Sequence, residues 1–234
     1  MLLVLNNTIA GNRAAGAGAG LRVDRCHATV INTILQRNAT LNGSELRVAG
    51  EEPIWYHASL TVKNSNVAGG EAAAVIGDFA TLTWGPGNID ADPLFVDPGH
   101  WDDAGTPTDP SDDTFILGDY HLLPGSPCID AGSNDVDNPD TPEIETLPDR
   151  DIAGLPRIID GNLDGTATVD IGAYEYLPGD VNYDGKVNVL DLLLVRNSLG
   201  RDPASSIEAR KADVNADGAV NVLDLLVVRG RLGK

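Results

Sequence analysis

The stretch from Asp180 to Gly233 contains an internal sequence duplication. Residues 180–200 and 213–233 are identical at 16 of 21 aligned positions, and the second copy starts at Asp213. Each copy opens with the pattern D-x-N-x-D-G and continues into a run of Val and Leu that is long enough for one helix. A duplication this close predicts two copies of the same structural unit.

Oxygen-bearing residues recur in each copy at the spacing of an EF-hand calcium loop. Side-chain oxygens stand at loop positions 1, 3, 5, 9 and 12, a main-chain carbonyl can serve at position 7, and Gly at position 6 permits the sharp turn. Asp at position 12 has a shorter side chain than the usual Glu, which favours a lower affinity for calcium. The spacing predicts two Ca²⁺ sites, and the alternative is a pair of Asx-rich turns without metal. The predicted ligands are Asp180, Asn182, Asp184, Lys186, Asn188 and Asp191 in the first loop, and Asp213, Asn215, Asp217, Ala219, Asn221 and Asp224 in the second.

One helix is expected after each loop, over residues 189–199 and 222–232, and no helix-length pattern precedes either loop. This arrangement resembles the type I dockerin module, which binds a cohesin domain in a calcium-dependent manner. Apolar Val-Leu replaces the Ser-Thr pair common in that family, and Gly230 replaces a polar residue in the second copy. The resemblance implies a duplicated surface that binds in two orientations. It places the partner contacts at Val189, Leu190, Arg196, Asn197, Val222, Leu223 and Arg229.

A third loop with the same opening spacing begins at Asp160. Asn162, Asp164 and Gly165 follow it in register, and Asp170 stands one residue earlier than a closing ligand should. A strand rather than a helix is expected next, and strand side chains alternate in direction, so Asp170 could point toward the loop or away from it. The segment therefore predicts either a third Ca²⁺ site or an Asx-turn hairpin whose carboxylates face water.

Short strand-like segments that end in Asn or Gly recur between Met1 and Gly70. Asn7, Asn32 and Asn64 mark their turns, and the period falls in the range of roughly 20–50 residues that is typical of solenoid repeats. Such repeats predict the stacked coils of a right-handed parallel β-helix, in which the Asn residues at equivalent turns stack as a hydrogen-bonded ladder from coil to coil. The Gly-rich residues 16–20 are expected to form a close turn, because they lack the Lys-Ser/Thr of a phosphate-binding loop.

The predicted coils begin at residue 1, which would leave the apolar edge of the first coil open. We therefore expect further coils and a signal peptide upstream, because Met1–Leu5 is too short to be one. No apolar run approaches the roughly 20 residues that a membrane-spanning helix needs, so no membrane insertion is expected. Cys26 and Cys128 are compatible with one disulfide or with two free thiols.

Acidic residues dominate the middle of the chain. The net charge is −19, and residues 71–179 hold 23 of the 35 acidic residues but only two basic ones. Such a segment repels phosphate groups, which excludes nucleic acid and anionic membranes as partners. Strand-like pieces alternate here with Asp, Pro and Gly turns, and they are expected at residues 73–76, 80–84, 94–96, 119–123 and 169–176.

Three stretches of this middle segment, residues 88–98, 120–132 and 170–175, resemble the C-terminal portion of bacterial surface β-helix proteins of the choice-of-anchor Q type. The resemblance implies no defined reaction. The expected organisation is multidomain: truncated β-helix coils over residues 1–70, an acidic irregular β cap over residues 71–178, and a small all-α dockerin over residues 179–234.

Two functions follow from these features. In the first, the chain is an extracellular or cell-surface β-helix protein whose dockerin plugs into a cohesin-type receptor. In the second, the β-helix is a glycoside hydrolase or polysaccharide lyase that the dockerin tethers to a multienzyme complex. No catalytic constellation is visible, because the four His residues are scattered and the abundant acids favour solvated turns over a catalytic carboxylate pair. The acids considered are Asp90, Asp92, Asp102, Asp103, Asp112 and Asp113, with Arg150 and Arg157 as the only nearby bases.

Overall fold

The computed structural model describes residues 1–40, 44–107, 109–137 and 144–233. The chain divides into two compact units. Unit 1 comprises Met1–Pro93, Asp97–Tyr120 and Ile171–Ala173. Unit 2 comprises Leu94–Val96, His121–Asp170 and Tyr174–Lys234.

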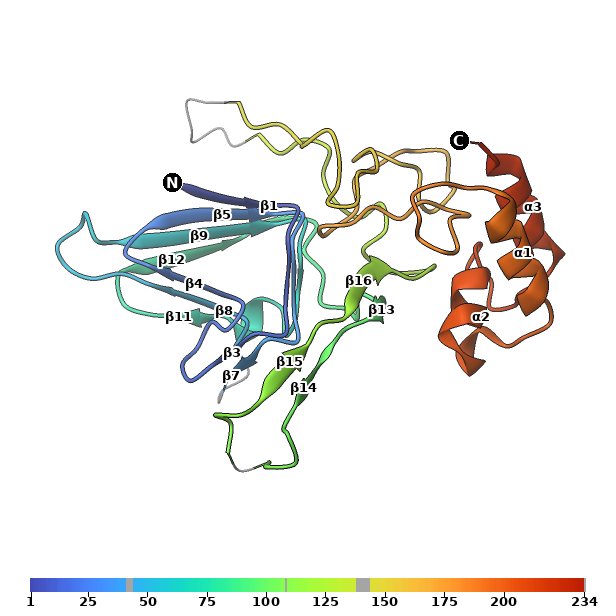
Figure 1. The fold of residues 1–234 in the computed structure, drawn as a ribbon. Helices are drawn as coiled ribbons and strands as arrows, with labels where there is room; N and C mark the ends of the chain where they lie inside the picture. The colour runs from blue at the N-terminus through green and yellow to red at the C-terminus, as the bar shows by residue number, and fades with distance from the viewer. Residues whose placement is uncertain (41–43, 108, 138–143, 234) are drawn as a thin grey trace. The chain divides into compact units, whose positions relative to one another are not determined.

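Unit 1 contains a parallel β-solenoid of about three coils, which confirms the predicted β-helix class (Figure 1). Every solenoid strand pairs in parallel with strands from neighbouring coils. The coils extend past residue 70, because the last strand of the first sheet ends at Trp84. The first sheet consists of β1 (Leu2–Leu5), β5 (His27–Ile31), β9 (Ala58–Lys63) and β12 (Ala80–Trp84), the second of β2 (Thr8–Ala10), β6 (Ile34–Gln36) and β10 (Asn66–Val67), and the third of β4 (Leu21–Asp24), β8 (Leu46–Ala49) and β11 (Val75–Ile76), while β3 (Arg13–Ala14) pairs with β7 (Ala39–Thr40).

Alternating side chains from all three sheets fill the interior of the solenoid. Val4, Val30, Val62 and Trp84 occupy equivalent positions in successive coils, and both Val30 and Val62 are fully buried. Because successive strand residues point to opposite faces, the apolar set of each strand points inward and the polar set faces water. The stacked rows of Val, Leu and Ile therefore form one continuous core.

The turns of the solenoid hydrogen-bond from coil to coil, but the register is shifted by one residue, and the acceptors at these positions are Thr and Ser hydroxyls instead of Asn side chains. Asn6, Asn32 and Asn64 are the equivalent residues, each with a left-handed backbone at φ values of 51°, 50° and 47°. Asn7 is therefore equivalent to Thr33. The N–H of Asn7 donates to Thr33 Oγ1 (3.3 Å), and the N–H of Thr33 donates to Ser65 Oγ (3.1 Å). Asn is the residue that tolerates this backbone best after Gly, which explains its recurrence.

Smaller elements follow the coils. The 3₁₀ helix η1 (Glu71–Ala73) replaces the start of the strand expected at residues 73–76. β13 (Phe95–Asp97) pairs with β16 (Asp119–Leu122), and β14 (His100–Asp102) forms an antiparallel hairpin with β15 (Thr114–Ile116). The indole N–H of Trp101 donates to the main-chain oxygen of Gly11 (2.8 Å), which holds this hairpin to the first coil.

The strand expected at residues 169–176 is not formed. The carboxylate of Asp170 accepts the N–H groups of Asp130 (2.8 Å) and Tyr176 (2.6 Å), and the carboxylate of Glu175 accepts the N–H of Asp170 (3.1 Å). Side chains that bond to main-chain N–H groups compete with strand pairing. Here these side-chain hydrogen bonds form in place of the expected strand. Both acidic groups are buried, and Arg157 donates to Glu175 Oε1 (2.9 Å).

The C-terminal part of unit 2 is helical, as expected, but contains one additional helix. Its elements are α1 (Val189–Ser198), the 3₁₀ helix η2 (Pro203–Ser205), α2 (Ile207–Ala212) and α3 (Val222–Arg231). Helix α2 was not predicted, because it is too short to show a helical period. Ser206 starts it by accepting the N–H of Ala209 (3.1 Å), and Ala209 and Ala212 are buried in the helical core. Cys26 and Cys128 are not joined by a disulfide, and the first is exposed while the second is buried.

Candidate calcium-binding and docking site

Helices α1 and α3 begin in the same way, at residues that were predicted to be metal ligands. Asn188 accepts the N–H of Leu190 (2.8 Å), and Asp191 accepts the N–H of Asn188 (2.8 Å). Asn221 and Asp224 repeat this capping box at the start of α3. Each pair satisfies N–H groups that a helix start leaves unbonded. The same residues therefore serve positions 9 and 12 of the loop and fix the first turn of the helix, a role that the sequence analysis missed.

The first loop, residues 180–191, is closed by hydrogen bonds to its two terminal carboxylates. Asp180 accepts the N–H groups of Asp184 (3.1 Å) and Gly185 (2.8 Å). Asp191 accepts the N–H groups of Val181 (2.9 Å) and Asn182 (3.3 Å). The backbone of Gly185 is left-handed, with φ +81°, as the turn at position 6 requires.

The second loop, residues 213–224, repeats the same pattern. Asp213 accepts the N–H groups of Asp217 (3.1 Å) and Gly218 (3.0 Å), and Asp224 accepts the N–H of Asn215 (3.2 Å). Gly218 has φ +88°. The duplication seen in the sequence is thus a duplication of backbone geometry and hydrogen bonding.

One position distinguishes the two loops. Tyr183 stands at position 4 of the first loop, where the second has Ala216, and both residues have a left-handed backbone. The Tyr183 hydroxyl donates to the main-chain oxygen of Leu122 (3.0 Å), and its ring lies 4.9 Å from the His121 ring. The Lys211 ammonium lies 4.8 Å above the same ring, a cation–π distance. The first loop is therefore anchored to the segment before it through a side chain that the second loop lacks.

Burial sets the electrostatics of both loops. Burial raises the pKa of Asp180 to about 6, and the nearby carboxylates of Asp191 and Asp184 add to the rise. Burial also raises the pKa of Asp213, with the charges of Asp224 and Asp217 acting in the same direction. Like charges held together in a buried site disfavour ionisation, and a bound divalent cation reverses that effect. The donor set of each loop therefore fits Ca²⁺, a hard cation that takes oxygen ligands.

The remaining predicted ligands lie in the same loops. Asn182 donates to Asp184 (3.0 Å), Asn215 donates to Asp217 (2.9 Å), and the main-chain oxygen of Ala219 accepts from Asn221 (2.9 Å). Lys186 follows Gly185 with its N–H bonded to Asp184 (3.0 Å). Within the described part of the chain, no three His, Cys, Asp or Glu side chains gather closely enough to hold a metal by themselves. A calcium ion here would therefore need the amide and main-chain oxygens as well.

The structure separates the predicted ligands of the third loop into two groups. Asp160, Asn162 and Asp164 lie together in one turn, where Asp160 accepts the N–H of Gly165 (3.1 Å) and Asp164 accepts the N–H of Thr166 (2.8 Å). Asp170 has its carboxylate directed to the main chain of Asp130 and Tyr176, as described above.

An apolar surface lies at the N-terminal ends of α1 and α3. Val189 and Leu190 are 61% and 53% exposed, and Val222 and Leu223 are 62% and 50% exposed. The structure adds three exposed leucines on the same helices that the sequence analysis did not assign, namely Leu193, Leu194 and Leu226. The sequence contained a pattern that could have indicated these leucines, because the Val-Leu runs are too apolar for a helix face that water covers. We call these seven residues the apolar docking face.

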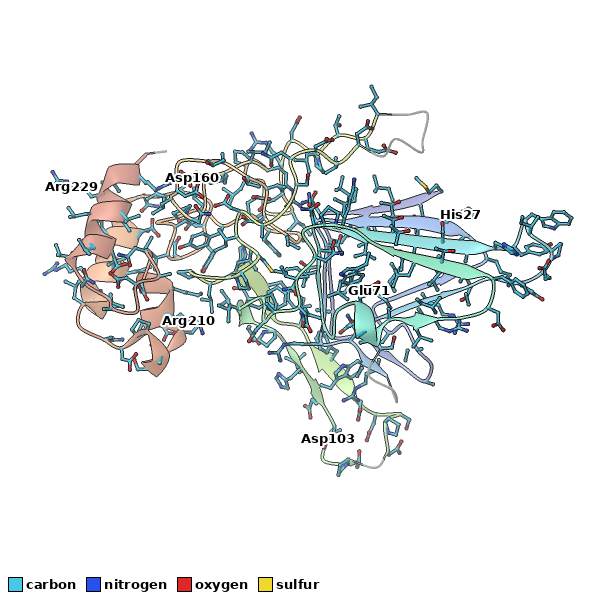
Figure 2. The ribbon with its side chains drawn as sticks, turned by 180° about the vertical axis from the view of Figure 1, so that it is seen from behind. His27, Glu71, Asp103, Asp160, Arg210 and Arg229 are labelled. Carbon is cyan, nitrogen blue, oxygen red and sulfur yellow. The ribbon has the colours of Figure 1, made fainter. Side chains whose placement is uncertain are left out.

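Polar residues further along the same helices complete the predicted contact set. Arg196 and Asn197 are exposed near the end of α1, and Arg229 projects from the outer side of α3 (Figure 2). A basic rim beside exposed apolar side chains is the usual composition of a protein-binding surface.

Three of the acids considered for catalysis accept main-chain hydrogen bonds. Asp102 and Asp103 accept the N–H groups of Ala104 (3.0 Å) and Gly105 (3.0 Å), two residues further on, which is the Asx turn that Asp commonly makes. Asp90 accepts the N–H of Gly69 (3.1 Å), which lies 21 positions earlier in the sequence. The glycoside hydrolase or polysaccharide lyase reading, and polysaccharide as a partner, stay hypotheses.

The duplicated loop and helix, with an apolar face at each helix start, define a small paired-loop docking module. Residues 178–233 match the family described as the dockerin type I domain. This match implies a cohesin as the partner of that segment. No curated protein and no solved structure matches the chain. The choice-of-anchor Q resemblance of the middle segment is supported by none of these comparisons and stays a hypothesis. No helix in the described ranges is long and apolar enough to cross a membrane.

Proposed function

We propose that residues 179–234 dock this protein, in a calcium-dependent manner, onto a cohesin-type receptor outside the cell. The observation that carries the proposal is the apolar docking face, whose residues in each copy lie on both sides of the closing carboxylate, in the first turns of α1 and α3. A face of this kind on a small helical module is costly in water unless a partner covers it. In this organisation the solenoid coils and the acidic region that follows them, residues 1–178, are the cargo that the module positions.

Calcium acts in this proposal through the loops and not through the face. Asp180, Asn182, Asp184, the main-chain oxygen of Lys186, Asn188 and Asp191 would hold one ion, and their counterparts from Asp213 to Asp224 the other. Each ion supplies positive charge to buried carboxylates that otherwise repel one another. Because Asn188 and Asp191 also cap α1, ordering of the loop orders the first helical turn, where Val189 and Leu190 stand.

The docking test changes each apolar pair to Asp, with calcium in excess. Val189→Asp/Leu190→Asp is expected to weaken binding to a type I cohesin about twofold, because one of two equivalent orientations is lost. Adding Val222→Asp/Leu223→Asp is expected to weaken it about a hundredfold or more, since buried apolar anchors dominate such interfaces. Acidic residues are favourable in the first turn of a helix, so these changes spare the fold. Calorimetric titration measures the affinities.

A matched control adds two charges elsewhere in the module. Ala204→Asp/Ser205→Asp alters the exposed η2 helix and is expected to leave the affinity unchanged. Complete loss of binding from the first pair alone would contradict two equivalent orientations, and full binding by the fourfold variant would contradict the docking face itself.

A further inference from the structure

The loop that begins at Asp160 (Figure 2) has the backbone of the two duplicated loops, although no helix follows it. Leu163 at position 4 has φ +67°, compared with +57° for Tyr183 and +53° for Ala216. Gly165 at position 6 has φ +93°, close to the values of Gly185 and Gly218. The N–H of Gly165 donates to the position 1 carboxylate at 3.1 Å, as it does in both other loops.

The closing carboxylate of this loop comes from Asp130, which lies well before the loop in the sequence. Asp130 Oδ2 accepts the N–H of Asn162 (2.7 Å), and Asp130 Oδ1 accepts the N–H of Thr168 (3.3 Å). Asn162 and Thr168 are positions 3 and 9 of the loop. In the first loop the same two positions donate to the two oxygens of Asp191, at 3.3 and 2.8 Å. Asp130 therefore takes the place that position 12 fills in the duplicated loops.

Neighbouring contacts hold Asp130 against the loop. The N–H of Gly132 donates to the main-chain oxygen of Val169 (2.9 Å), and Asn134 accepts the N–H of Val169 (2.9 Å). Position 2 is Gly161, where a Cβ atom would lie 2.7 Å from Cγ2 of Ile129. The duplicated loops have Val at this position, so the glycine makes room for the segment that carries Asp130.

One oxygen in this loop lacks a partner within the protein. Oδ1 of Asp160, the position 1 residue, is buried and accepts no hydrogen bond from any described residue. A buried carboxylate oxygen without a donor is costly, and native structures almost always supply a hydrogen bond, a water molecule or an ion. This orphaned oxygen is an observation separate from the loop geometry, and it points to a ligand.

We propose that residues 160–168 and Asp130 form a third Ca²⁺ site, with side-chain oxygens from Asp160, Asn162, Asp164 and Asp130 and the main-chain oxygen of Thr166. Asp130 replaces Asp170, which the sequence spacing had suggested. Main-chain and side-chain oxygens with a tight glycine turn are the ligand set that calcium prefers. The site goes beyond docking, because it would link two distant segments of unit 2 and stabilise the region before the dockerin.

The test is calcium stoichiometry of the full chain, measured by calorimetric titration after removal of metal by a chelator. The wild type is expected to bind three Ca²⁺, and Asp130→Asn and Asp164→Ala are each expected to bind two. Asp164 is exposed, so its variant tests the site even if Asp130→Asn fails to fold, which circular dichroism reports. Asp149→Asn, an exposed acid of the same unit, is the matched control and is expected to keep three.

A variant of the duplicated loops separates this site from the docking proposal. Asp184→Ala/Asp217→Ala is expected to leave one ion bound, and that ion is expected to be lost when Asp130→Asn is added. A wild type that binds two ions, with neither lost in Asp130→Asn, overturns the third site and leaves the docking proposal intact. Three ions retained by both Asp130→Asn and Asp164→Ala also overturn it. One ion that depends on Asp130 alone supports the third site and contradicts calcium-dependent docking.

Discussion

Removal of calcium is expected to unfold α1, α2 and α3 while the solenoid strands stay folded. Among the described residues, the buried apolar core of the helical segment consists of Val and Ala side chains, and the leucines of this segment are exposed or half-buried. Four carboxylates, those of Asp180, Asp191, Asp213 and Asp224, are buried in the same segment. A small core with buried like charges has little stability of its own, so the metal must supply it.

The size of this effect follows from ligand linkage. At a free calcium concentration a hundredfold above the dissociation constant, each site adds about 2.7 kcal/mol to the free energy of unfolding. Two sites therefore account for about 5 kcal/mol, a large part of the stability of a small domain.

Hydrogen exchange of the full chain, with calcium and then with EDTA, measures this effect segment by segment. Amides of residues 189–231 are expected to lose protection in EDTA, while amides of β5 and β9 keep theirs. Asp184→Ala/Asp217→Ala is expected to reproduce the EDTA result in the presence of calcium, and Asp103→Ala, an exposed turn residue, is expected not to. Unchanged protection of α1 and α3 in EDTA would contradict a metal-dependent fold.

Substitution of Arg157 by Met is expected to destabilise unit 2 by about 3–5 kcal/mol near pH 8, the typical cost of removing one partner from a buried ion pair. The Arg157 side chain is only 5% exposed, and that of its partner Glu175 is fully buried. Burial raises the pKa of Glu175, and the charge of Asp170 raises it further, while Arg157 opposes both effects. Burial likewise raises the pKa of Asp170, with Asp130 adding to the rise and Arg157 opposing it. Without the arginine, two buried carboxylates face each other with no cation.

The loss in Arg157→Met is expected to shrink as the pH falls. Both carboxyl groups have folded-state pKa values above their unfolded values, which lie near 4. A group of this kind stabilises the fold fully below its unfolded pKa and loses that contribution as the pH rises through its folded pKa. Removal of Arg157 raises the folded values further, so the destabilisation is larger at pH 8 than at pH 5.

Urea unfolding at the two pH values measures the difference, with calcium held constant. Arg150→Met, which removes an exposed arginine of the same region, corrects for general effects of charge and of calcium affinity and is expected to change stability by less than about 0.5 kcal/mol. An equal loss at both pH values would mean that packing of the arginine, and not its charge, stabilises the cluster.

The residue spacing was enough to predict the local features of this protein. The duplicated D-x-N-x-D-G loops, the glycine at position 6 and the helix after each loop are contained within short consecutive stretches of chain, so short-range geometry determines them. The recurring Asn turns predicted stacked coils for the same reason, although the register was wrong by one residue at Asn7. Only strand pairing, with Leu5 beside Ile31, shows that Asn6 is the equivalent residue.

Tertiary structure decided every feature in which distant residues meet. The carboxylate that closes the Asp160 loop comes from Asp130 and not from the nearer Asp170, because pairing of residues 132–134 with residue 169 brings the earlier segment alongside the loop. Asp170 was instead drawn into a buried cluster with Arg157 and Glu175, where its hydrogen bonds to main-chain N–H groups prevent the expected strand. Sequence spacing carries no information about such contacts, since they depend on which surfaces the folded chain buries together.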